Sequence, residues 1–199
     1  FVDDAAAACG EIIFSLFEHF KIPVDLEAAK TLYTSISTDT GSFRYSNTSP
    51  KTHRTIGALI EAGLNVERIN QEIYGEFEEA RLELLQLLLK NRQFAFDRKI
   101  SFSMLPHADL VKTGGTPEDM EGLIDFLRGI RGVKACFLMT EWTKGIVKVS
   151  FRSSTDVDVN QVASQIKGGG HRKAAGATLR DTTLEAAKTR ILEIFKSIL

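Results

Sequence analysis

The sequence predicts an α/β protein of two domains, and three features of the chain lead to that prediction. Apolar residues recur at helical spacing through residues 5–60. A leucine-rich segment, residues 82–89, is apolar nearly all round, which is typical of a helix buried on two sides. After residue 94, alternating strand-like segments are interspersed with helical ones. We therefore expect a connector helix over residues 76–95, between one domain at residues 1–75 and a smaller mixed α/β domain at residues 96–199.

Three helices are predicted in the first domain. The first covers residues 5–20. Its expected buried stripe is Ala8, Ile12, Leu16 and Phe20. Asp25 can cap the second helix. The expected buried face of that helix is Ala29, Leu32, Tyr33 and Ile36. Ser49 and Pro50 form an N-cap and N1 pair for the third helix, which stops at Gly63.

The second domain is predicted from shorter segments. Alternating apolar residues indicate a hairpin around residues 97–99, and strands at 133–142 and 146–151 joined by a turn at Lys144-Gly145. A short strand is expected at residues 176–179. Helices are expected at residues 117–128, 158–166 and 182–199, the last capped by Thr182 with Glu185.

The composition is that of an ordinary soluble globular protein. Lys and Arg number 25 against 26 Asp and Glu, so the net charge is −1, and 43% of residues are hydrophobic. No apolar run approaches the roughly 20 residues of a membrane span. Two cysteines, Cys9 and Cys136, and no recognisable secretory signal favour a cytoplasmic protein. The chain begins at Phe1 rather than Met, so we expect further residues upstream.

The neutral total conceals an uneven distribution of charge. Residues 144–180 carry seven Lys or Arg against two Asp, a charge of +5. Residues 61–90 carry seven Glu against three Lys or Arg, a charge of −4. The second domain is therefore basic, which suits an anionic partner.

The most specific local signal is the run from Lys167 to Lys173, which contains three consecutive glycines and His171. Glycines let successive N–H groups approach an anion, above all a phosphate, and the cations that follow favour the same ligand. The alternative is a flexible loop with a solvated basic flank. Arg152, followed by Ser153, offers a planar fork and a hydroxyl at a strand end, although an arginine there is often merely exposed.

Asp39 is the second signal. It follows directly on the second helix, where a carboxylate faces the negative end of the helix dipole unless a cation compensates. A metal ion would do so. The alternative is an Asx-type turn, which is common for Asp-Thr-Gly.

Asp39–Arg44 together with Gly168–His171 resembles the DHH-superfamily phosphoesterases, and most closely the nanoRNase/pAp-phosphatase type, which is related to RecJ-like exonucleases. Further matching segments are Val2-Asp3 with Ala8, Gly10 and Glu11; Leu32-Tyr33; Glu121–Leu123; and Val149–Ser153. Two motifs in the right order and separation are more specific than either alone.

The resemblance implies that residues 1–75 are the C-terminal part of a DHH catalytic domain and residues 96–199 the DHH-associated substrate-binding domain. In that family the catalytic domain holds two divalent ions, usually manganese with magnesium as the alternative. By resemblance Asp39 is a catalytic metal ligand. The residues expected to bind substrate are Arg152, Ser153, Gly168, Gly169, Gly170, His171 and Lys173.

One departure from the family is large, because no Asp-His-His triplet occurs in this chain. The expected metal site is therefore incomplete here, and the chain alone is expected to be inactive. The predicted activity is metal-dependent hydrolysis of short RNA or DNA oligonucleotides and of 3′-phosphoadenosine 5′-phosphate, by a protein that can form a homodimer. The alternatives are a non-catalytic nucleotide-binding module and a relative that acts on cyclic dinucleotides or polyphosphate.

Overall fold

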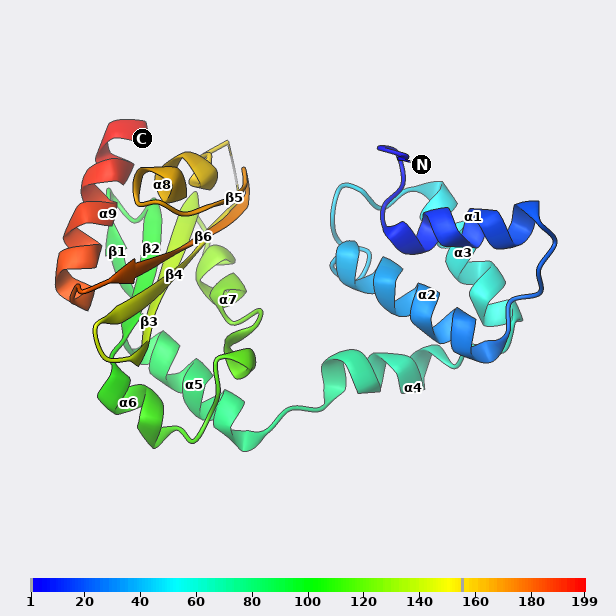
Figure 1. The fold of residues 1–199 in the computed structure, drawn as a ribbon, viewed down its shortest axis with the longest axis horizontal. Helices are drawn as coiled ribbons and strands as arrows, with labels where there is room; N and C mark the ends of the chain where they lie inside the picture. Colours follow the sequence, from blue (N-terminus) through cyan, green and yellow to red (C-terminus); the bar gives the residue numbers. More distant parts are fainter. Residues whose placement is uncertain (1, 155) are drawn as a thin grey trace. The chain divides into compact units, whose positions relative to one another are not determined.

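The fold is mixed α/β, as predicted. The structure is a computed structural model that describes residues 2–154 and 156–199. This part of the chain divides after Glu76 into two compact units, each described here by itself (Figure 1). No helix in the described ranges combines the length and the apolar character that a bilayer crossing requires.

The first unit is helical. Its elements are α1 (Cys9–His19), α2 (Leu26–Asp39), α3 (Pro50–Glu61), α4 (Val66–Asn70) and a π-helical turn (Gln71–Gly75). The predicted buried face of α2 is confirmed, because all four of its residues are at most 5% exposed. The caps are confirmed too: the Asp25 side chain accepts a hydrogen bond from the Ala28 N–H (2.8 Å), and Ser49 forms a capping box with Thr52.

The predicted stripe of the first helix is confirmed at Ala8, which is buried, and wrong at Leu16 and Phe20. The residues of α1 that are buried are Gly10, Glu11 and Phe14, whereas Leu16 and Phe20 are 45% and 65% exposed. The cause is a close approach of two backbones, since a Cβ atom at Gly10 would lie 3.0 Å from the Leu32 carbonyl oxygen. The glycine therefore decides which face of α1 packs on α2.

The second unit is built on a six-stranded sheet within the described residues, in the order β1-β2-β3-β4-β6-β5. The strands are β1 (Gln93–Ala95), β2 (Ile100–Leu105), β3 (Ala135–Thr143), β4 (Ile146–Ser153), β5 (Gly169–His171) and β6 (Ala174–Arg180). Strands β2 and β3 are parallel, and every other pair is antiparallel. The predicted hairpins at residues 97–99 and 144–145 are confirmed.

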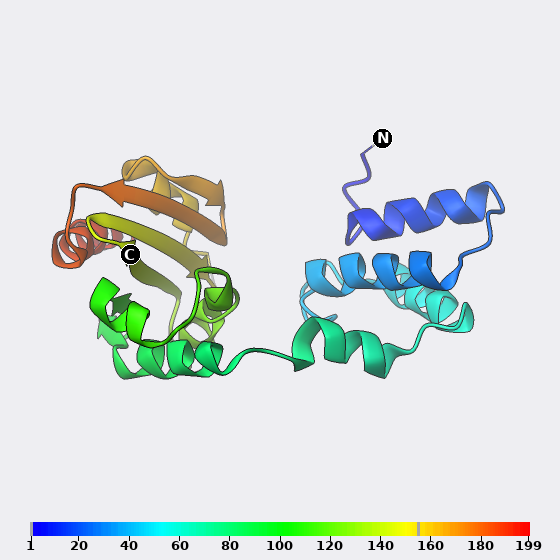
Figure 2. The same cartoon turned by 60° about the horizontal axis from the view of Figure 1, so that its bottom comes forward.

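Helices cover the sheet unequally (Figures 1 and 2). On one face, α8 (Val159–Gln165) and α9 (Leu184–Ile198) pack over β2, β3, β4 and β6. The centre of that core is a row of three paired phenylalanines, Phe102, Phe137 and Phe151, against which Phe195 of α9 packs. On the other face, α5 (Glu79–Lys90), α6 (His107–Lys112) and α7 (Ile124–Arg128) cover β2 and β3. The second face of β4 and β6 is left open to solvent over much of its length.

The leucine-rich helix α5 packs within the second unit and is buried along one stripe. Leu84 and Leu88 are fully buried in the core of that unit, whereas Leu82 is 50% exposed. Within the second unit α5 is therefore buried along one side, and burial on two sides stays a prediction. The sheet offers α5 only one surface on which to pack.

Two further local predictions are wrong. The helix expected at residues 117–128 is broken into a 3-10 turn (Glu118–Met120) and α7, with Gly122 between them at φ +76°. Helix α9 is capped by Thr183, which accepts a hydrogen bond from the Ala186 N–H (3.2 Å), and not by Thr182.

Candidate functional site

The open face of β4 carries a row of polar side chains. Val147, Val149 and Phe151 point into the core between the sheet and α8–α9. Because side chains alternate along a strand, Lys148, Ser150 and Arg152 lie on the opposite face, and none of the three is buried. The neighbouring strand β6 places only small side chains beside two of them, since Ser150 pairs with Gly176 and Arg152 with Ala174. This row, Lys148–Ser150–Arg152, is called the β4 strip below.

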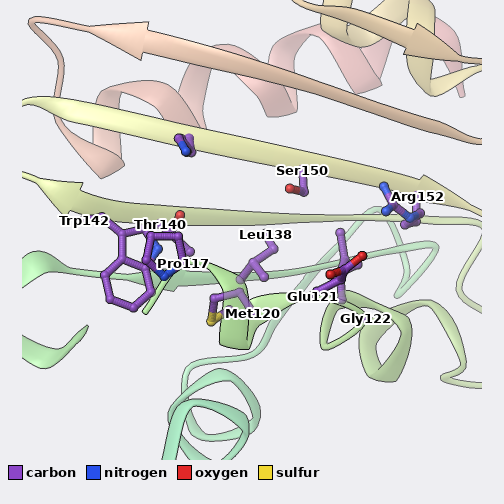
Figure 3. Close-up of a pocket in the computed structure, with 11 residues that line it drawn as sticks. Pro117, Met120, Glu121, Gly122, Leu138, Thr140, Trp142, Ser150 and Arg152 are labelled. Atoms are coloured by element: carbon purple, nitrogen blue, oxygen red, sulfur yellow. The ribbon is translucent and has the colours of Figure 1, made fainter. Parts of the chain in front are cut away.

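A pocket of about 300 Å³ lies at one side of the β4 strip (Figure 3). Its lining comes from β3, β4 and the segment before α7: Pro117, Met120, Glu121, Gly122, Ile124, Leu138, Thr140, Trp142, Lys148, Ser150 and Arg152. Part of the lining is apolar and aromatic, and the two cations of the β4 strip lie at different points along it, since Lys148 pairs with Thr140 and Arg152 with Cys136. Trp142 and Arg152 lie at opposite ends of the pocket, with Glu121 at the Arg152 end.

A second, shallower hollow lies on the other side of the strip, over β6 and the glycine run. Lys148 and Ser150 line both hollows. The other residues of the second hollow are Val149, Lys167, Gly168, Gly169, Gly176, Ala177 and Thr178. The two hollows are therefore parts of one continuous surface, with the strip between them.

Two residues of the glycine run, Gly169 and Gly170, belong to the edge strand β5, where a loop was one expectation. A Cβ atom at Gly168 would lie 2.2 Å from the Gly176 carbonyl oxygen, and one at Gly170, where φ is +147°, 2.6 Å from that of Ala174. Both positions therefore need glycine for close packing on β6. Gly169 differs, because the nearest atom to its Cβ position, the Asn160 Oδ1, is 3.9 Å away. Of the three glycines, only Gly169 faces free space.

His171 and Lys173 lie at the hairpin between β5 and β6, and both are exposed. His171 pairs with Ala174, which pairs with Arg152. Neighbouring strands are separated by about 5 Å, so the Cα atoms of His171 and Arg152 are about 10 Å apart, with only an alanine side chain between them. Residues directly paired in this way share a face of the sheet. The His171 imidazole and the Arg152 guanidinium therefore lie on either side of a space that is large enough for a phosphate group.

Ser153 lies apart from these residues. It is 1% exposed, and its hydroxyl donates a hydrogen bond to the Lys134 carbonyl (3.3 Å). As the neighbour of Arg152 on the strand, it points to the covered face of the sheet. The structure therefore brings Arg152, Gly168, Gly169 and His171 around the open face and leaves Ser153 outside it.

Asp39 ends α2 as predicted, with an exposed side chain. The turn after it is made by the next residue, since the Thr40 hydroxyl accepts a hydrogen bond from the Phe43 N–H (3.1 Å). Residues 41–43 all have positive φ, between +55° and +65°. Across residues 2–154 and 156–199, no group of three or more His, Cys, Asp or Glu side chains could hold a metal ion. The described residues by themselves do not fit a two-metal centre.

Cys136 belongs to the apolar core beneath the sheet. It is fully buried in β3 under α7. Burial, and in second place the nearby Asp125 carboxylate, raises the pKa of its thiol to about 12. The thiol is therefore protonated at neutral pH and takes no part in nucleophilic chemistry.

Four residues of these hollows, Lys148, Ser150, Glu121 and Trp142, were not predicted as site residues. The first two could have been found, because they alternate with Val147, Val149 and Phe151 in a strand that was predicted. Glu121 and Trp142 lie 21 residues apart in the sequence and line the same pocket only because a broken helix packs beside β3. No local pattern carries that information.

Known proteins resemble the chain along almost its whole length. Residues 100–199 match the DHHA1 domain family. The bifunctional oligoribonuclease and PAP phosphatase NrnA of Thermus thermophilus is 30% identical over 193 residues, which are 96% of this chain and 57% of that protein. The protein of the same name from Bacillus subtilis is 29% identical and shares 89% of this chain and 56% of its own length.

A solved structure agrees with these matches. The exopolyphosphatase-related protein of Bacteroides fragilis superposes with a TM-score of 0.89 at 26% identity, over 97% of this chain and 58% of that one. The chain thus spans a little more than half the length of the relatives it matches. The part that it spans includes the six-stranded sheet with its β4 strip and glycine edge. The chain belongs to the DHHA1 domain family, within the DHH superfamily of phosphoesterases of the nanoRNase type.

Proposed function

We propose that this chain binds and orients the substrate of a divalent-metal-dependent phosphoesterase that hydrolyses short oligonucleotides and 3′-phosphoadenosine 5′-phosphate. The observation that carries the proposal is the β4 strip with its two hollows, a continuous basic surface beside a glycine edge. The names of the relatives from Thermus thermophilus and Bacillus subtilis, oligoribonuclease and PAP phosphatase, support the same class of substrate.

Each group of this surface has a role in the proposal. Arg152 binds a phosphate through its planar guanidinium, and Ser150 donates a hydroxyl hydrogen bond. Lys148 adds a mobile positive charge between the two hollows. His171 and Lys173 bind the same phosphate from the other side, and Gly169 leaves room for the ligand beside the backbone. The strip spans roughly 13 Å from Lys148 to Arg152, so it can hold more than one phosphate.

The metal centre is a separate part of the proposal. Asp39 is proposed as one ligand of a divalent ion, with manganese preferred over magnesium. A bound divalent ion of this kind activates water and stabilises charge during phosphoester hydrolysis. Because the described residues do not fit a complete centre, we assign them binding and orientation and no catalytic step. A cytoplasmic location and a homodimer stay predictions.

The proposal is tested by replacing one cation of the strip. Arg152→Ala in the polypeptide that carries this chain is expected to weaken binding of a three-nucleotide RNA by about tenfold or more, since hydrogen bonds to charged groups contribute about 1.5–3 kcal/mol. It is also expected to lower the salt dependence of binding by about one released ion. Lys196→Ala is the matched control, because it removes an exposed cation from α9, outside both hollows.

Hydrolysis is measured on the same RNA with manganese. Binding that depends on Arg152, together with manganese-stimulated cleavage that is lost in His171→Ala, supports the proposed phosphoesterase. Binding with no cleavage under any divalent ion favours the non-catalytic nucleotide-binding module instead. Equal RNA affinity of the Arg152→Ala and Lys196→Ala variants would show that the β4 strip is not the substrate site.

A further inference from the structure

We propose that the pocket of Figure 3 is a base-recognition subsite that prefers guanine, with Glu121 as its specificity-determining residue. The inference rests on the proposed function, because it takes the β4 strip as the place where the phosphate binds. Lys148, Ser150 and Arg152 line this pocket as well as forming the strip. A nucleotide whose phosphate lies on the strip therefore has its base beside the pocket.

The apolar part of the pocket lining can pack against a base, whereas it offers no hydrogen bond or charge to a phosphate. Trp142, Met120, Pro117 and Leu138 contribute flat or apolar surface. Single-stranded nucleic acids bind by stacking bases on such aromatic side chains, which contribute about 1–3 kcal/mol per base. The volume of about 300 Å³ is of the size that encloses a small ligand. A site that bound only phosphate would need neither the tryptophan nor this volume.

The polar end of the pocket selects among the bases. Figure 3 shows Glu121 and Arg152 at the end away from Trp142. Within the described ranges neither Glu121 nor Arg152 forms an ion pair, and the Arg152 guanidinium uses Nη1 for a hydrogen bond to the Phe151 carbonyl (3.0 Å), so the Glu121 carboxylate and the other N–H groups of Arg152 can meet a ligand. An ionised carboxylate only accepts hydrogen bonds. The adjacent N1–H and N2–H₂ groups of guanine are two donors that match its two oxygens, whereas uracil offers one N–H between two carbonyls and adenine one amino group.

The backbone that carries Glu121 is held in place from α5. The Arg81 guanidinium donates hydrogen bonds to the carbonyls of Asp119 (2.8 Å) and Glu121 (2.6 Å). The Asp119 carboxylate in turn accepts hydrogen bonds from the N–H (2.8 Å) and the hydroxyl of Thr116. These contacts break the helix at Gly122 and fix the segment that lines the pocket. Arg81 is therefore a positioning residue for the carboxylate of Glu121.

The protein contains a built-in reporter for this pocket. Trp142 is its only tryptophan, so a change in the tryptophan fluorescence of the 199-residue chain reports ligand binding in this pocket. We expect 5′-GMP to quench this fluorescence and to bind roughly tenfold more tightly than 5′-UMP, because a good bidentate pair discriminates by about that factor or more. Inorganic phosphate is expected to bind more weakly than either nucleotide and to leave the fluorescence unchanged.

Two variants isolate the carboxylate. Glu121→Gln keeps the size of the side chain but exchanges one acceptor oxygen for a donor, so we expect a roughly tenfold loss of GMP affinity and no loss of UMP affinity. Glu118→Gln is the matched control, because Glu118 is an exposed carboxylate of the same segment that does not line the pocket. It is expected to leave both affinities unchanged.

The outcomes separate this inference from the function on which it rests. Equal GMP and UMP affinities, or equal losses for both in Glu121→Gln, would overturn the guanine subsite. If those equal affinities still depend on Arg152, the phosphate-binding role of the strip stands. If neither nucleotide nor phosphate binds, the proposed function and the subsite both fail.

Discussion

The three consecutive glycines give a test that separates packing from ligand binding. Each is replaced by alanine in turn, so one methyl group is added at residues 168, 169 and 170. At Gly168 the new Cβ atom would lie 2.2 Å from the Gly176 carbonyl oxygen, where ordinary contact begins at 3.4 Å. Strand β5 would have to move away from β6 by about 1 Å, and overpacking of this kind costs about 1–3 kcal/mol. At Gly170 a contact of 2.6 Å adds to a backbone at φ +147°, which costs an alanine about 1–3 kcal/mol of strain.

Gly169→Ala is the matched control within the same strand. Its methyl group has no neighbour closer than 3.9 Å, so the free energy of unfolding should change by no more than about 0.5 kcal/mol. Because Gly169 lines the second hollow with Lys148 and Ser150, the methyl group should weaken nucleotide binding while stability is kept. We therefore expect the glycine that packing does not require to be the one that ligand binding requires.

The assay is thermal unfolding followed by the fluorescence of Trp142, which lies in the same unit as the glycines. A loss of about 2 kcal/mol lowers the melting temperature by about 4–8 °C for a chain of this size. We expect that decrease for Gly168→Ala and Gly170→Ala, and a change below about 2 °C for Gly169→Ala. Equal melting temperatures for all three variants would refute the packing argument. Full nucleotide affinity in a stable Gly169→Ala variant would refute its role beside the ligand.

Three further predictions follow from the second unit and from the two cysteines. Thr183→Ala should reduce the free energy of unfolding by about 1 kcal/mol and Thr182→Ala by much less, in urea denaturation, because the hydroxyl of Thr183 caps α9. Phe137→Ala should cost about 3–5 kcal/mol in the same assay, since this fully buried ring stacks on Phe102 at 4.8 Å; a loss below 1 kcal/mol would contradict its central place in the core. A thiol reagent at pH 8 should label exposed Cys9 rapidly and Cys136 only after urea is added, because burial raises the pKa of the Cys136 thiol; rapid labelling of two thiols in the native protein would contradict this.

Local signals predicted those elements whose determinants are local. The face of α2 and the caps at Asp25 and Ser49 depend on residues within a few positions of one another. The hairpin at Lys144-Gly145 has the same local origin, since the N–H of Gly145, at φ +77°, donates a hydrogen bond to the Glu141 carboxylate. These features could be read from the sequence without knowledge of the tertiary fold.

The failed predictions share a different cause. The face of α1 that packs on α2 is the one that contains Gly10, because the backbone of α2 comes close to this residue. The helix expected at residues 117–128 is broken because Arg81, about forty residues earlier, binds two of its carbonyls. Contacts between residues so far apart in the sequence produce no periodicity or motif from which they could be predicted. The same holds for the pocket, whose tryptophan and glutamate meet only after the sheet has formed.

The motif residues of the site illustrate both cases. Arg152 and the glycines were predicted from their chemistry, and the structure brings them to one surface of the second unit. Ser153 shares the motif but points to the opposite side of the sheet, because it follows Arg152 on a strand. A motif gives the neighbours of a functional residue along the chain, and the strand period decides which of them the ligand can reach.

The parallel pair of the described sheet, β2 with β3, has a consequence for the two proposed binding sites. Parallel neighbours require a crossover connection of a dozen residues or more, and here residues 106–134 provide it. That crossover carries Glu121 and Met120, whereas the groups proposed to bind phosphate lie on the antiparallel strands β4, β5 and β6. In the proposed mode of binding, the choice of base and the binding of phosphate therefore depend on separate stretches of the chain. Exchange of the crossover can alter the first and leave the second intact.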